Sequence, residues 1–189
     1  MYEFKTISKV AWCCSEFEVY LNILVGEYFK IGYNVDKKDN IYYVVTAKHV
    51  VDKEYYESLL DSKIEYISDT TDLAILSFEY DGDLTVLDFE SEKISKNDKI
   101  MVIGHPEGKR YKITYGYIKS GLKDFRGDKV IEHDAYMKQG NSGGVALTKN
   151  MKIAGINIAG TFTLSGHYRF GYMIPYDIVK SNIETWRNQ

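Results

Sequence analysis

The chain has 189 residues, and its 24 lysines and arginines stand against 27 aspartates and glutamates, for a formal net charge of −3 at pH 7. Charged residues make up 27% and hydrophobic residues 44%, which are ordinary values for a globular protein and exclude disordered, collagen-like and coiled-coil chains. A slightly acidic chain has no overall positive field for phosphate backbones, so we expect no nucleic-acid partner.

The composition favours strands, because the chain has 17 tyrosines and 8 phenylalanines but only 2 prolines. In the first hundred residues, apolar side chains recur with a period of two between polar turn clusters. This pattern predicts strands at residues 18–24, 28–34, 41–46, 64–68, 73–79 and 99–103. Residues 51–62 carry apolar side chains at three-to-four spacing and predict a short helix.

The second half repeats the strand pattern, with predicted strands at 111–120, 129–134, 144–147, 153–158 and 168–174. Residues 175–187 form a predicted amphipathic helix with Ile178, Ile183 and Trp186 facing inward. The sequence therefore predicts an all-β protein of two lobes, residues 1–90 and 91–189, with a helix at the end of the second.

No run of about 18 apolar residues predicts a membrane span, and the first ten residues lack the basic start and apolar core of an export signal. We therefore expect no membrane partner and a cytoplasmic location, or secretion if a leader is missing from this sequence. The only cysteines, Cys13 and Cys14, are adjacent, which excludes a disulfide scaffold and makes a poor metal site.

The sharpest local motif is Gln-Gly-Asn-Ser-Gly-Gly at residues 139–144, where a serine lies among glycines. Such a loop turns sharply and lets another molecule approach the backbone closely, so it suits a serine nucleophile at Ser142. Taken alone, the motif also fits a glycine-rich hairpin turn with a solvated serine.

A serine nucleophile needs a base, and the base needs a carboxylate to orient it. Among the four histidines, His49 follows the apolar run 41–46, where a rigid strand would hold its ring. Asp72 directly precedes the apolar run 73–78, although Asp69 competes for the same role. His105, His133 and His167 lie in turns or polar contexts.

The motif at Ser142 also matches the Gly-x-Ser-x-Gly elbow of α/β-hydrolases, but those enzymes place the acid and then the histidine after the serine. Here the order after Ser142 is reversed, because His167 comes before Asp177. The pattern of alternating strands and helices is also absent. The order His49, Asp72, Ser142 is instead the order found in chymotrypsin-like double barrels.

With these motifs the chain resembles the trypsin-like serine peptidases, in particular the protease domain of the HtrA (Deg) type. The resemblance rests on the histidine block at 46–51, the aspartate block at 71–76, the serine block at 140–144, and the stretches 98–108, 155–157 and 170–175. It implies two packed six-stranded antiparallel β-barrels of the chymotrypsin type with a C-terminal helix. The barrel within 1–90 would carry His49 and Asp72, and the barrel within 91–189 would carry Ser142.

The resemblance implies a serine endopeptidase that forms an acyl-enzyme without any cofactor or metal. Ser142 would be the nucleophile, His49 the base and Asp72 its orienting acid, with the backbone N–H groups of Gly140 and Ser142 as the oxyanion hole. A protein or peptide would be the substrate. The residues implied to bind it are Tyr136, Met137, Gln139, Asn157, Ile158, Ala159 and Gly160.

Several alternatives stay open. Tyr136 and Met137 favour an apolar specificity pocket, whereas Asn157, His167 and Arg169 would suit an acidic side chain. Val145 and Lys138-Gln139 depart from the residues usual in the family, and the chain ends at Gln189 without room for a PDZ module. A protease-like binding module that has lost catalysis, and a latent protease that an activating partner switches on, are the rival functions.

Overall fold

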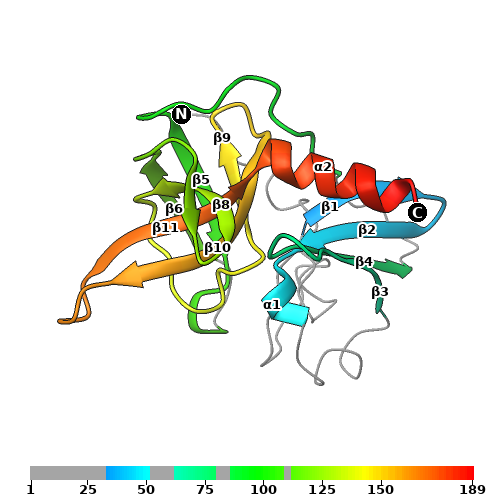
Figure 1. Ribbon diagram of the computed structural model, residues 1–189, viewed down its shortest axis with the longest axis horizontal. Coiled ribbons are helices and arrows are strands. Elements are labelled where there is room, and N and C mark those ends of the chain that lie inside the picture. Colours follow the sequence, from blue (N-terminus) through cyan, green and yellow to red (C-terminus); the bar gives the residue numbers. More distant parts are fainter. Residues whose placement is uncertain (1–32, 52–61, 80–85, 109–111) are drawn as a thin grey trace.

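The structure is a computed structural model that describes residues 33–51, 62–79, 86–108 and 112–189. The predicted strand at 18–24, most of the predicted strand at 28–34, nearly all of the predicted helix at 51–62, and Cys13 and Cys14 lie outside these residues. Antiparallel strands dominate the described part of the chain, with one long helix at its end (Figure 1). The predicted all-β class with a C-terminal helix is confirmed.

The first lobe is an antiparallel sheet of four described strands in the order β1-β2-β4-β3. The strands are β1 (Tyr33–Lys38), β2 (Ile41–Thr46), β3 (Ser62–Ile67) and β4 (Ala74–Glu79), and helix α1 (Lys48–Val51) follows β2. Strand β2 has the bounds predicted from the sequence. Because β2 and β4 pair with Thr46 opposite Ala74, the end of β2 lies beside the start of β4.

The second lobe is a seven-stranded sheet in the order β6-β5-β9-β10-β11-β8-β7. Its elements are β5 (Lys99–Gly104), the 3₁₀ turn η3 (Pro106–Gly108), β6 (Lys112–Tyr117), β7 (Lys123–Phe125), β8 (Asp128–His133), β9 (Val145–Thr148), β10 (Ile153–Phe162) and β11 (Tyr168–Pro175). A β-bridge between Ile118 and His133 joins the end of β6 to β8 and curls the sheet.

The structure differs from the predicted strands mainly around two hairpins of the second lobe. Strand β10 continues to Phe162, beyond the predicted end at 158, and forms a protruding hairpin with β11 (Figure 1). Strand β7 was not predicted, because its three residues are too few for a periodic pattern. It pairs with β8 across a two-residue turn.

The two lobes share a hydrophobic core, in which Val45, Leu73 and Ile75 of the first lobe cluster with buried residues of the second, including Ile103 and Ile156. The predicted division at residues 90 and 91 stays a prediction. The sheets themselves end at Glu79 and begin again at Lys99. A continuous core of this kind holds the facing edges of the lobes in a fixed relation.

Helix α2 (Tyr176–Arg187) closes the chain and crosses from the second lobe to the first (Figure 1). Ile183 is buried, and Ile178 and Trp186 are partly buried against the shared core, as predicted. The Trp186 ring also lies 4.9 Å from the ring of Tyr43 on β2. The helix thus packs on both lobes rather than on the second alone. None of the helices in the described segments has the length and apolar character that a membrane crossing needs.

Candidate active site

His49 lies in the first turn of α1, directly after β2. Its side chain is 47% exposed, so the imidazole is accessible from solvent. Asp72 precedes β4, and the pairing of β2 with β4 places it beside His49 although 23 residues separate them. The register of the sheet therefore brings His49 and Asp72 together, whereas the sequence gives only their order along the chain.

Asp72 binds His49 through both of its carboxylate oxygens. The backbone N–H of His49 donates to Oδ1 at 2.8 Å, and its ring Nδ1 lies 2.5 Å from Oδ2. An ionised carboxylate only accepts, so Nδ1 carries the proton in this pair and Nε2 is left to accept one. The rival acid Asp69 is exposed on the same loop, while both of these hydrogen bonds go to Asp72.

The hydrogen bonds from His49 outweigh burial at Asp72. Burial by itself would raise the pKa of the Asp72 carboxyl, but the two bonds from His49 and the nearby charges of His49 and Lys48 hold the pKa below its usual value. Asp72 is consequently a carboxylate at neutral pH and keeps the proton of His49 on Nδ1.

The serine loop is anchored from the turn that follows β5. The N–H of His105 donates to the Gly140 carbonyl at 3.2 Å, and the N–H of Glu107 donates to the Gln139 carbonyl at 2.7 Å. A Cβ on Gly140 would lie 2.0 Å from the His105 carbonyl oxygen, and Gly140 has φ of +96°. Only glycine fits this position without distortion.

The carbonyls of two peptide units of this loop accept hydrogen bonds. The Gln139 carbonyl accepts from Glu107, and the Asn141 carbonyl accepts from the N–H of Gly144 at 3.0 Å. In a trans peptide the N–H points opposite to the C=O. The N–H groups of Gly140 and Ser142 therefore each point away from the group that their peptide carbonyl accepts from.

Ser142 is half-buried, and its hydroxyl donates to the Ile158 carbonyl of β10 at 3.2 Å. The structure thus brings His49 and Asp72 into direct contact but turns the Ser142 hydroxyl to β10. Among the interactions of the described residues, no hydrogen bond joins Ser142 to His49.

The predicted substrate-binding residues fall on two adjoining segments. Gly160 lies against Met137, since a Cβ at Gly160 would be 3.5 Å from that of Met137. The ring of Tyr136 meets the edge of the Tyr168 ring at 5.0 Å. Gln139 and Gly160 are exposed, Ala159 is partly exposed, and Met137 and Ile158 are buried. Their role in specificity stays a prediction.

Asn157 is fully buried and already bonded at both ends of its amide. Its Nδ2 donates to the Gly144 carbonyl at 3.0 Å, so its Oδ1 accepts from His133 Nε2 at 3.1 Å. Burial lowers the pKa of His133 to about 4, against the opposing effects of the Asn157 bond and nearby acids. His133 is therefore a neutral interior residue. His167 bonds instead to Ser165 within the β10–β11 turn.

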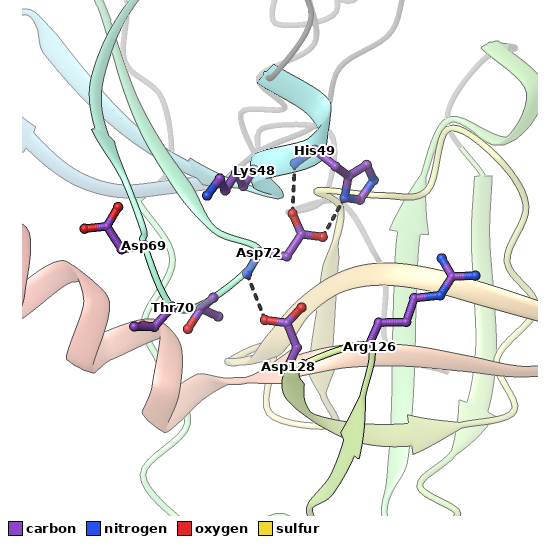
Figure 2. A pocket seen from close by; sticks show the side chains of 9 residues that line it. Lys48, His49, Asp69, Thr70, Asp72, Arg126 and Asp128 are labelled. Atoms are coloured by element: carbon purple, nitrogen blue, oxygen red, sulfur yellow. Dashed lines mark hydrogen bonds and ion pairs between the residues drawn. The ribbon is translucent and has the colours of Figure 1, made fainter.

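Sequence reasoning missed the contribution of the β7–β8 hairpin. A depression of about 280 Å³ beside His49 and Asp72 is lined by both lobes (Figure 2). Its lining residues are Lys48, His49, Asp69, Thr70, Thr71, Asp72, Arg126, Gly127 and Asp128. The sequence signals the turn at Gly127, but nothing in it signals the contact with Asp72.

No three His, Cys, Asp or Glu side chains gather as metal ligands in the part of the chain that the structure describes.

The family model described as a trypsin-like peptidase domain matches residues 32–156. The periplasmic serine endoprotease DegP of Salmonella typhimurium is 29% identical over 151 residues, which cover 74% of this chain and 32% of that protein. A probable periplasmic DegP-like protease of Chlamydia trachomatis is 31% identical over 156 residues, covering 75% of this chain and 31% of the relative. The chain thus spans about a third of the length of these curated relatives.

Solved structures share the fold. The HtrA-type protease AlgW with a decapeptide matches with a TM-score of 0.73 at 22% identity, over 85% of this chain and 52% of that one. The inactive form of a serine-to-alanine mutant of Rv3671c from M. tuberculosis matches with a TM-score of 0.66 at 19% identity, over 85% and 82% of the two chains. The predicted resemblance to HtrA-type proteases is confirmed.

The predicted cytoplasmic location is wrong. It rested on the absence of an export signal in the first residues, whereas the similar proteases are named as periplasmic proteins.

Proposed function

Because the chain belongs to the trypsin-like peptidase family, we propose that it is a serine endopeptidase acting through His49, Asp72 and Ser142. The observation that carries this proposal is the pair of hydrogen bonds from His49 to Asp72, which leave the imidazole half exposed with Nε2 ready to accept a proton. A carboxylate that fixes the tautomer of an accessible histidine is the base that a serine nucleophile requires.

In the proposed reaction, the Ser142 hydroxyl leaves the Ile158 carbonyl and attacks the carbon of a peptide carbonyl. His49 Nε2 takes the hydroxyl proton and then delivers it to the departing amine, leaving an acyl-enzyme. Water, deprotonated by His49, releases the acyl group and restores the serine. Asp72 stays ionised throughout, in keeping with its lowered pKa.

The charge on the attacked oxygen would be stabilised by the N–H groups of Gly140 and Ser142. The anchoring of the Gln139 and Asn141 carbonyls on the opposite side supports this role. Each such donor stabilises the transition state by about 3–4 kcal/mol in enzymes of this kind. The chain needs no metal or organic cofactor for any of these steps.

The proposed substrate is a protein or peptide that binds in extended form along residues 158–160 of β10. Among the described strands, β9 pairs with β10 only at residues 153–156, so residues 158–160 have no strand partner on that side, which supports addition of an extended peptide there. We propose an apolar specificity pocket formed by Tyr136 and Met137. Cleavage of a peptide panel is expected to favour large apolar residues before the cut. Cleavage mainly after Glu would favour the acidic alternative, and cleavage only after Arg or Lys would exclude both pockets.

A latent form of this protease is a second candidate, since the Ser142 hydroxyl bonds to Ile158 in the present structure. A substrate or activating partner would then release the hydroxyl toward His49. We place either form in a secreted or periplasmic compartment, like the relatives.

A fluorophosphonate probe distinguishes these states, because it reacts only with a serine that a working base has activated. Intact mass is expected to show one label on the wild-type protein and none on Ser142→Ala. Labelling that appears only after a peptide or partner is added would indicate latency. Absence of labelling under every condition, in a folded sample, would contradict the proposed enzyme and favour a binding module.

A further inference from the structure

A second carboxylate touches the proposed catalytic aspartate from the opposite lobe. The backbone N–H of Asp72 donates to Oδ1 of Asp128 at 2.9 Å, although 56 residues separate the two (Figure 2). Asp72 belongs to the first sheet's loop before β4, and Asp128 begins β8 of the second sheet. Asp72 is consequently held at its backbone by one lobe and at its carboxylate by His49 of the other.

The hairpin that carries Asp128 is well anchored. Strands β7 and β8 pair with Phe125 opposite Asp128, and the two turn residues, Arg126 and Gly127, have φ of +54° and +96°. Two positive φ values in a two-residue turn match the twist of an antiparallel hairpin. The Phe125 ring stacks on Tyr172 of β11 at 4.1 Å. A rigid element of this kind can set the position of the group that it presents.

The contact between Asp128 and Asp72 is electrostatically unfavourable, because it brings two carboxyl groups together. Burial raises the pKa of Asp128, and the neighbouring charge of Asp72 raises it further, despite the bond from the Asp72 N–H and the charges of His49 and Lys48. A neutral acceptor would cap the Asp72 N–H without placing two carboxylates together. Functional sites often retain charged groups in positions where they lower the stability of the folded protein.

We propose that Asp128 is a positioning residue, which fixes the Asp72 backbone and through it the orientation of His49, so that the β7–β8 hairpin sets the geometry of the catalytic residues. The inference rests on the proposed peptidase function. It adds a residue that acts through Asp72, and it makes the first lobe's catalytic pair depend on the second lobe.

The test compares Asp128→Ala, which removes the acceptor, with Asp128→Asn, which keeps an oxygen at the same position. Asp124→Ala is the matched control, because Asp124 lies exposed on the same hairpin and, within the described segments, pairs with Lys129 on the surface. We expect alanine to lower kcat at least tenfold with KM within twofold of wild type. Asparagine is expected to restore most of that loss, and Asp124→Ala to match wild type.

The second readout is the downfield proton resonance of His49 Nδ1–H, which does not depend on turnover. Asp128→Ala is expected to shift or broaden it, and Asp128→Asn to leave it near its wild-type position. If alanine does not fold, Asp128→Val replaces it, since valine also lacks an acceptor and suits strand β8. Wild-type kcat and an unmoved resonance in either acceptor-free variant would overturn the proposal.

These readouts separate the two hypotheses. A folded wild-type protein that stays unlabelled and inactive under every condition, but whose His49 resonance responds to Asp128→Ala, would contradict the peptidase proposal and support the positioning contact. An active wild-type enzyme whose kcat and His49 resonance are unchanged by Asp128→Ala would support the peptidase proposal and contradict the positioning role of Asp128.

Discussion

Replacing Ser142 by alanine is expected to lower kcat for peptide cleavage about 10⁶-fold, because no other group supplies the nucleophile. The fold should tolerate the change. Ser142 is only half-buried, and the hydrogen bond that its hydroxyl makes to described residues goes to the Ile158 carbonyl. Loss of such a bond costs about 1 kcal/mol of unfolding free energy. Initial rates on a peptide substrate and a thermal melt measure both effects.

The partner variant His49→Ala should lose activity to a similar extent, since serine and base act as a unit. We expect the double variant His49→Ala/Ser142→Ala to be no worse than either single one, because the remaining rate comes from the rest of the site. Ser95→Ala, in the exposed turn before β5, is the control for removing a serine and should cleave like wild type. Turnover retained by Ser142→Ala would refute the assignment.

Acid should destabilise the protein through His133. Burial lowers its pKa from 6.5 to about 4, so between these values the unfolded chain binds a proton that the folded chain does not. Stability from a neutral buried histidine is therefore present above pH 6.5 and declines as pH falls toward 4. The gap corresponds to about 3 kcal/mol of unfolding free energy for this one residue. Denaturant melts at pH 7 and pH 4.5 measure it.

His133→Gln is the matched variant, because a glutamine amide can still donate to Asn157 Oδ1 but does not titrate in this range. We expect it to remove most of the pH dependence assigned to His133. Asp72 changes stability at lower pH, since its carboxyl has a lowered pKa and its contribution is lost only as pH falls below the usual carboxyl range. A wild-type slope in His133→Gln between pH 6.5 and 4.5 would mean that another group titrates there.

Local patterns in the sequence predicted much of the fold. Strand β2 was predicted with its observed bounds, since a short apolar run of six residues between turns has few other conformations that bury its side chains. Strand β7 was not predicted, because three residues are too few for a periodic pattern and its hairpin depends on a turn with positive φ at Arg126. The predicted location failed for a different reason, since an address is read by cellular machinery and not by folding.

The sequence by itself determined the order of His49, Asp72 and Ser142 and most of the strands that lie next to them, because period, turn residues and glycine loops are local properties. Only the tertiary structure decided which partners these residues meet. Three contacts join residues that are separated in the sequence: the hydrogen bond from Ser142 to Ile158, the packing of Trp186 on Tyr43, and the hydrogen bond from the Asp72 N–H to Asp128. The first contact depends on how the second lobe folds and the other two on how the lobes pack around a shared core, which no local pattern encodes.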